Sequence, residues 1–134
     1  MKINTLIFSL LCFFGTNVWA QAPLITITTT PAGERIVADS IGKTLYIFEP
    51  DIPSKMPTCY GVCAEDWPPY LLTDAEAASL SAPLGVVMRT TNRKQLTYDG
   101  LPVYTYAFDR VMGDNKGDGV GGVWHDIELG SQGK

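Results

Sequence analysis

The chain has 134 residues and a formal net charge of −4, with 10 Lys and Arg residues against 14 Asp and Glu residues. Its basic residues form no cluster, so the chain lacks the electrostatic footprint of a nucleic-acid-binding protein, and nucleic acid is not an expected partner. A chain of this length is sufficient for one domain with an apolar core.

Residues 1–20 have the pattern of a secretory signal peptide. Lys2 supplies the positive charge, and the apolar run over residues 6–14 is much shorter than the ~20 residues that cross a bilayer as a helix. Val18 and Ala20 are the small residues that signal peptidase reads before a cut. We therefore expect cleavage after Ala20, and a segment that stays attached as a membrane anchor is the alternative.

The mature domain, residues 21–134, is expected in the periplasm or outside the cell, without insertion into a membrane. Apolar and threonine residues alternate over residues 24–30, which is typical of a half-buried strand. Further strands are predicted at 35–38, 44–48, 85–90, 95–98, 103–107 and 122–127. Residues 91–93 predict a hairpin turn, and the capping-box spacing of Thr73 and Glu76 predicts one short helix over residues 73–80.

An internal repeat becomes visible when the sequence is shifted by 58 positions against itself. The matching pairs are Gly42 with Gly100, Tyr46 with Tyr104, Phe48 with Tyr106, Asp51 with Asp109, Gly61 with Gly119 and Val62 with Val120; Trp67 meets Trp124 after the loss of one position. Two such units are too few for a solenoid. We therefore predict a mainly β fold: a single small domain of two pseudo-symmetric β units, about 35–72 and 93–129, with one short helix.

These residues resemble a bacterial family of secreted and lipoprotein repeats of unknown function, whose hallmark is Y-x-[FWY]-x-x-D. The hallmark stands twice, at residues 46–51 and 104–109. Residues 59–69 are similar to the family's C-x-G-x-C-A-x-x-W-P-P, residues 95–104 to Q-V-T-Y-x-G-x-P-L-Y, and residues 113–124 to its glycine-rich ending. The resemblance implies a location in the cell envelope and a β domain built from repeats, and it implies no reaction.

The chain departs from the lipoproteins of this family at one point. Many relatives are lipid-anchored, and a lipobox needs a small residue directly before its cysteine. Here Leu11 precedes Cys12, and both lie inside the apolar run. Lipid anchoring is therefore not expected.

The candidate ligand-binding residues are the aromatic and acidic residues of the repeated motif. They are Tyr46, Phe48, Asp51, Trp67, Tyr104, Tyr106, Asp109 and Trp124. In the first interpretation they pack between the two units, and each Asp accepts a hydrogen bond from a Tyr hydroxyl, a Trp N–H or a turn amide. In the second they form an aromatic platform, with Asp51 and Asp109 as polar anchors for a sugar or another flat ligand.

Cys59 and Cys63 are the only cysteines of the mature segment, and an even pair in an exported protein favours a disulfide. The alternative is copper, because two thiolates and the imidazole of His125 are ligands that suit this soft metal. The copper-delivery proteins with this ligand set have a thioredoxin fold, which the predicted elements do not suggest. His125 is otherwise a surface or edge residue.

A second metal hypothesis concerns the glycine-rich segment near the C-terminus. Asp114 and Asp118, with Asp109 nearby, are oxygen donors of the kind that calcium prefers. The spacing does not fit an EF-hand, because Lys116 and His125 stand where ligands are required. A Gly/Asp turn with no metal is the alternative interpretation.

These observations lead to one main functional hypothesis and one alternative. The main hypothesis is a non-enzymatic protein of the cell envelope that binds an unknown envelope ligand or protein and needs no cofactor. The alternative is a periplasmic copper or redox protein that uses Cys59, Cys63 and His125.

Overall fold

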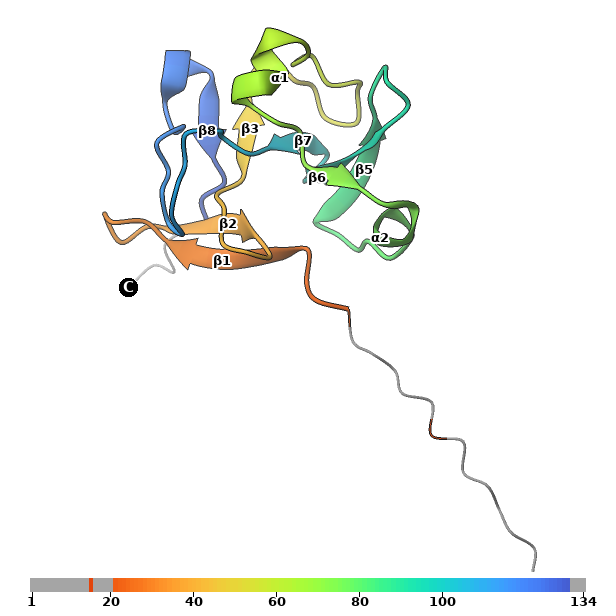
Figure 1. Cartoon of the computed structure of the whole chain (residues 1–134), viewed down its shortest axis with the longest axis horizontal. Helices are drawn as coiled ribbons and strands as arrows, with labels where there is room; N and C mark the ends of the chain where they lie inside the picture. Colours follow the sequence, from red (N-terminus) through yellow and green to blue (C-terminus); the bar gives the residue numbers. More distant parts are fainter. Residues whose placement is uncertain (1–14, 16–20, 131–134) are drawn as a thin grey trace, which may run out of the picture.

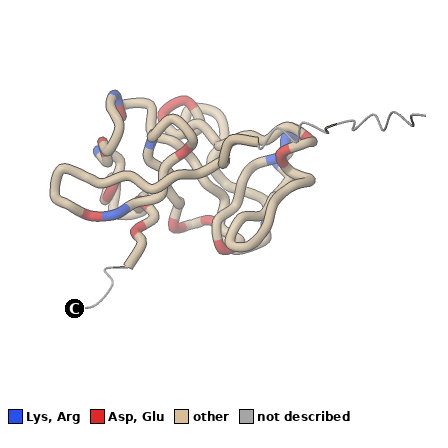
Figure 2. Tube along the Cα trace, turned by 90° about the horizontal axis from the view of Figure 1, so that it is seen from below, with Lys and Arg blue, Asp and Glu red and all other residues tan. Residues whose placement is uncertain are grey.

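The structure is a computed structural model that describes Gly15 and residues 21–130. The predicted signal peptide, apart from Gly15, lies outside the described residues. None of the helices within residues 21–130 is long and apolar enough to cross a membrane. Acidic and basic residues lie next to one another at several places along the chain (Figure 2).

Strands dominate the described residues, so the predicted mainly β fold is confirmed (Figure 1). The elements in chain order are β1 (Ile25–Thr29), β2 (Arg35–Asp39), β3 (Tyr46–Phe48), α1 (Val62–Asp66), β4 (Leu71–Leu72), α2 (Asp74–Ala78), β5 (Leu84–Met88), β6 (Lys94–Tyr98), β7 (Leu101–Tyr104), the 3-10 helix η1 (Val120–Gly122) and β8 (Trp124–Asp126). The capping box that predicts α2 is present, with Thr73 at the N-cap and Glu76 at N3. The short elements α1, η1 and β4, each of five residues or fewer, were not predicted from the sequence.

Matching antiparallel hairpins lead into the two units, with β1 and β5 just before the predicted units and β2 and β6 inside them. In β1–β2, Ile25 lies opposite Asp39 and Thr29 opposite Arg35. In β5–β6, Leu84 lies opposite Tyr98 and Met88 opposite Lys94, which is the same register 59 positions later. The turns of both hairpins contain a residue with positive φ, Gly33 in the first and Asn92 in the second, so the predicted turn over residues 91–93 is confirmed.

β1 and β2 form a two-stranded sheet, and the other six strands form a larger one, at whose centre strands of the two units pair with each other. The strand order of the larger sheet is β4-β6-β7-β3-β8, and β5 also pairs with β6. β3 of the first unit pairs with β7 of the second, and β8 of the second unit pairs with β3 of the first. The counterpart of the β3–β8 pairing is a β-bridge between Pro69 of the first unit and Tyr104 of the second. The central strands of each unit therefore depend on the other unit for their hydrogen-bonded neighbours.

The central strands separate two apolar clusters, because successive side chains of a strand point to opposite faces. On one face, Leu45 and Val103 belong to an aliphatic cluster with Leu96. On the other face, Tyr46 and Tyr104 belong to an aromatic cluster with the two repeat tryptophans. All of these residues are buried, as the apolar and aromatic alternation predicts.

Candidate functional site

Four aromatic rings from both units stack into one column. Its order is Phe48, Trp124, Trp67 and Tyr106, so that residues of the first unit alternate with residues of the second. The ring centroids are separated by 4.2, 3.8 and 4.1 Å, and the interplanar angles are 19°, 2° and 25°. The two equivalent tryptophans thus lie nearly parallel at the centre, each with an aromatic residue of the other unit outside it.

Two further tyrosines meet the column edge-on. Tyr46 contacts Trp67 at 5.3 Å between centroids and 81° between planes, and Tyr104 contacts Trp124 at 5.2 Å and 87°. Edge-to-face contacts are favourable because the positive edge of one ring meets the negative face of the other. The near-identical values show that the pseudo-symmetry extends to the packing of single rings.

Each of these tyrosines binds the motif aspartate of the other unit. The Tyr46 hydroxyl donates to Asp109 at 2.6 Å, and the Tyr104 hydroxyl donates to Asp51 at 2.7 Å. The second carboxylate oxygen accepts a backbone amide seven residues on, from Thr58 at 2.8 Å or from Lys116 at 3.0 Å. Both carboxylates are therefore buried but satisfied, which is the condition under which a buried acid is tolerated.

This arrangement shifts the protonation equilibria of the buried groups. Burial and the facing carboxylates raise the pKa values of Tyr46 and Tyr104 far above the ordinary tyrosine value. Burial also raises the pKa of Asp109, although the hydrogen bonds from Tyr46 and from the Lys116 amide act against this rise. Both phenols are thus protonated donors at neutral pH.

The hydrogen bonds predicted for packing between the units are present, namely a Tyr hydroxyl and a turn amide on each Asp. Six of the eight motif side chains are buried: Tyr46, Asp51, Trp67, Tyr104, Asp109 and Trp124. Phe48 and Tyr106, at the two ends of the column, are partly exposed. Ligand binding by these eight residues stays a prediction.

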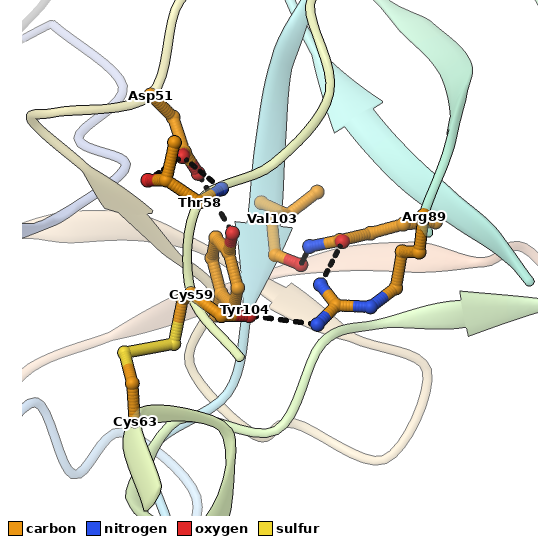
Figure 3. The surroundings of a disulfide bond; sticks show 8 residues. Asp51, Thr58, Cys59, Cys63, Arg89, Val103 and Tyr104 are labelled. Atoms are coloured by element: carbon orange, nitrogen blue, oxygen red, sulfur yellow. Dashed lines mark hydrogen bonds between the residues drawn. A yellow bond between two sulfur atoms is a disulfide. The ribbon is translucent and has the colours of Figure 1, made fainter. Parts of the chain in front are cut away.

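Cys59 and Cys63 form a disulfide, as expected from the sequence, with their Cα atoms 5.4 Å apart. The loop that it closes is tied to the second unit by Arg89, whose guanidinium donates to the Cys59 carbonyl at 2.7 Å and to the Gln95 side chain at 2.7 Å (Figure 3). The same guanidinium lies 4.1 Å from the centre of the Tyr60 ring. Arg89 is only 6% exposed, and no sequence motif marks it.

The other candidate metal ligands have protein partners of their own. The imidazole of His125 lies 3.3 Å from the Glu49 carboxylate. Asp114 accepts the backbone amides of Arg110 and Val111, and Asp118 accepts the amide of Asp126. Within residues 21–130 no three His, Cys, Asp or Glu side chains form a cluster that could hold a metal ion. The structure thus brings together neither Cys59, Cys63 and His125 nor Asp109, Asp114 and Asp118.

A groove of about 690 Å³ lies elsewhere, between the segment that leads into β1 and the helix α2. It is lined by Gln21, Ala22, Pro23, Leu24, Ile25, Thr73, Ala75, Glu76, Ser79, Leu80, Ser81 and Leu84. Sequence reasoning missed this site, because its two walls come from segments about fifty positions apart. The only local signal was the capping box, which placed the helix but not its neighbour.

The groove has an apolar floor and one charged residue. Leu24, Ile25, Leu80 and Leu84 also pack against the aliphatic cluster, so the floor is continuous with the core. The Tyr70 hydroxyl donates to the Leu24 carbonyl at 3.0 Å and fastens the wall that precedes β1. The side chain of Gln21, hydroxyls of Ser and Thr residues and the carboxylate of Glu76 supply the polar groups.

Glu76 is held as a carboxylate by the helix N-terminus. Its carboxylate accepts the Thr73 amide at 2.7 Å and the Thr73 hydroxyl at 2.8 Å. These bonds lower the pKa of Glu76, with the backbone amide as the larger cause. The groove therefore carries a fixed negative charge and not a proton donor.

Comparison with known proteins gives one match. The family model described as a secreted repeat of unknown function matches residues 26–70 and again residues 85–127. Both segments begin inside the first strand of a hairpin, so they include strands that lie outside the units of about 35–72 and 93–129. No curated protein matches the chain, and neither does a solved structure.

Proposed function

The chain belongs to the family of secreted repeats of unknown function, and from this premise we propose that it is an exported, non-enzymatic module that binds a small, mainly apolar ligand carrying a positive charge. The observation that supports the proposal is the groove between residues 21–25 and α2. Its size lies within the range of ~300–1,000 Å³ that is common for small-molecule sites, and such sites are mostly apolar with a few placed polar groups.

The charge of the ligand follows from the lining of the groove. Glu76 is the only charged side chain among the lining residues, and its pKa is lowered. An anionic ligand would meet this carboxylate, and no side chain of the lining supplies a cation, whereas an ammonium group would be attracted. Because Glu76 already accepts hydrogen bonds from Thr73, it is suited to attract charge and not to transfer a proton.

The compartment is consistent with such a role. We place the mature domain in the periplasm or in the surrounding medium, because disulfides such as Cys59–Cys63 form and persist in oxidising spaces outside the cytoplasm. An apolar amine or a cationic amphiphile would reach the groove directly there.

A head-group series tests the proposal. Alkyl chains of one length, carrying a trimethylammonium, a neutral sugar or a sulfate head group, are titrated calorimetrically into the mature protein below their micelle concentrations. We expect the ammonium compound to bind best and the sulfate worst. The substitution Leu80→Lys, in the groove floor, should abolish binding of all three. Equal binding of the three head groups, or binding untouched by Leu80→Lys, contradicts the proposal.

Glu76→Gln isolates the charge. Glutamine also supports a capping box, so α2 should persist. Because a partly exposed charge contributes little, the ammonium compound should lose about two- to fivefold in affinity while the neutral compound is unchanged. Asp74→Asn, in the same helix but outside the groove lining, is the matched control.

A further inference from the structure

The aromatic column forms a continuous path from a partly exposed ring to two buried tyrosines. Tyr106 contacts Trp67, Trp67 contacts Trp124, and each tryptophan contacts one buried tyrosine edge-on. Each step along this path joins two rings whose centroids are between 3.8 and 5.3 Å apart. Aromatic rings in such contact allow an electron to pass from one to the next without crossing solvent or saturated backbone.

The two ends of the column differ in chemistry. The first unit carries Phe48 at the position where the second carries Tyr106, although the packing of the two rings is equivalent. A phenol loses an electron far more readily than a phenyl ring, because loss of its proton leaves a stabilised radical. The column therefore has one oxidisable end, Tyr106, and it is partly exposed.

A base is in place at each buried end. Oxidation by one electron turns a phenol into a strong acid, so its proton must leave at once. The hydroxyls of Tyr46 and Tyr104 lie 2.6 and 2.7 Å from the carboxylates of Asp109 and Asp51, within hydrogen-bond reach for proton transfer. Burial raises the pKa of Asp109 and makes it a better acceptor than an exposed carboxylate.

Competing electron donors are kept out of this cluster. Cys59 and Cys63 pack into it, but as a disulfide they present no thiolate. Met56 and Met112 are exposed and are not members of the cluster. An oxidising equivalent that enters at Tyr106 thus meets only aromatic rings before it reaches the buried tyrosines.

We propose that the aromatic column is a one-electron relay, which carries an oxidising equivalent from a one-electron oxidant at Tyr106 to Tyr46 and Tyr104. The oxidant gains one electron from Tyr106, which releases its phenolic proton to solvent and takes one back when an electron from a buried tyrosine replaces the one lost. The buried tyrosine loses that electron through the column and passes its phenolic proton to the facing aspartate, which leaves a neutral tyrosyl radical and a protonated carboxyl group. A reductant that returns the electron reverses both transfers. The relay is independent of the groove and of its ligand.

Flash photolysis of the mature protein tests the relay. Photogenerated ruthenium(III) tris-bipyridine, with a cobalt(III) complex as the sacrificial electron acceptor, serves as the one-electron oxidant. Transient absorption and freeze-quench electron paramagnetic resonance follow the radicals. We expect a tryptophan radical that converts to a tyrosyl radical, and the tyrosyl radical should outlive that of free N-acetyltyrosinamide. Formation of the tyrosyl radical should be slower in heavy water, because a proton moves with the electron.

Tyr106→Phe is the sharpest variant, because it gives the second unit the residue that the first unit carries at the equivalent position. It should lose most of the long-lived tyrosyl signal. Tyr98→Phe, outside the column, should keep it, and the double variant Tyr46→Phe/Tyr104→Phe should lose it fully. A signal that survives in Tyr106→Phe or in the double variant overturns the relay. The relay is also overturned if the unaltered protein shows no solvent isotope effect. This measurement does not depend on whether any variant folds.

Discussion

Tyr46 and Tyr104 lie directly opposite each other in the ladder between β3 and β7, and each donates its hydroxyl to the aspartate that follows the other. The two bonds are therefore related by the pseudo-twofold axis that passes between the strands. Together they fix the loop after β3 and the loop after β7 to the centre of the domain.

Removal of either hydroxyl should destabilise the domain. Tyr46→Phe leaves Asp109 buried with one donor fewer, and Tyr104→Phe does the same to Asp51. Each change should lower the free energy of unfolding by about 1–3 kcal/mol, because a buried acceptor loses its partner. Urea unfolding of the mature protein measures this. Tyr98→Phe removes a hydroxyl that takes no part in the two Tyr–Asp bonds, and it should stay close to the unaltered protein.

Alkaline pH should unfold the domain. In the unfolded chain the tyrosines lose their protons near pH ~10, whereas the folded protein holds those of Tyr46 and Tyr104 to higher pH. The unfolded state therefore binds fewer protons above this pH, and the stability present below it is lost as the pH rises toward the folded pKa values. Urea midpoints should fall steeply above about pH 10. A decline equally steep in the double variant Tyr46→Phe/Tyr104→Phe would assign it to other groups.

Reduction of the disulfide should weaken the domain without unfolding it. The closed loop is short, with a sequence separation of 4, so the chain-entropy estimate is about 2 kcal/mol. A domain with ordinary stability retains its fold after such a loss. The circular dichroism of Cys59→Ala/Cys63→Ala should match that of the unaltered protein, while its urea midpoint should be lower. Complete unfolding of this variant would show that the disulfide organises more than its own loop.

Arg89→Met should destabilise the domain by more than the loss of one charge suggests. The change removes the donors to the Cys59 carbonyl and to Gln95, both of which are fully buried. Loss of about 2–4 kcal/mol is expected, since unpaired buried acceptors keep their desolvation cost. The exposed Arg93, near the hairpin turn, provides the matched control as Arg93→Met. Equal stability of the two variants would exclude this role for Arg89.

Gly117 occupies a place where the column leaves no room. A Cβ atom there would lie 2.6 Å from the Trp67 ring and 2.9 Å from the Tyr46 ring. Gly117→Ala should therefore cost about 1–3 kcal/mol through overpacking, and it should change the tryptophan fluorescence. Gly130→Ala, where a Cβ meets nothing within 4 Å, should be neutral. A neutral Gly117→Ala would mean that the two rings shift more easily than their contacts suggest.

The sequence predicted those parts of the molecule that depend on short-range patterns. Alternation placed Tyr46 and Leu45 on opposite faces of a strand, and the identities at a shift of 58 positions revealed the repeat. The equivalence of β1 and β5 could not be seen in the sequence, because Ile25–Thr29 and Leu84–Met88 share a register and a place in the fold but no residue identity.

The remaining features depend on contacts between distant segments. Arg89 can be buried because its guanidinium donates to the carbonyl of Cys59 and to the side-chain amide oxygen of Gln95. No local sequence pattern reveals these contacts. The groove likewise exists only because the segment before β1 lies against α2. The candidate aromatic residues were found by their repetition, whereas their order in the column required the fold.

The crossed pairing has a consequence for how such a protein could arise. Because β8 pairs with β3 and each phenol is bound by the opposite unit, one unit alone would leave its central strand and its carboxylate without partners. A shorter ancestral polypeptide holding one unit would have been obliged to assemble as a homodimer. Tandem duplication of its gene would then place both units in one chain, so that their association becomes intramolecular. Folding would no longer depend on the protein concentration, which is low outside the cell.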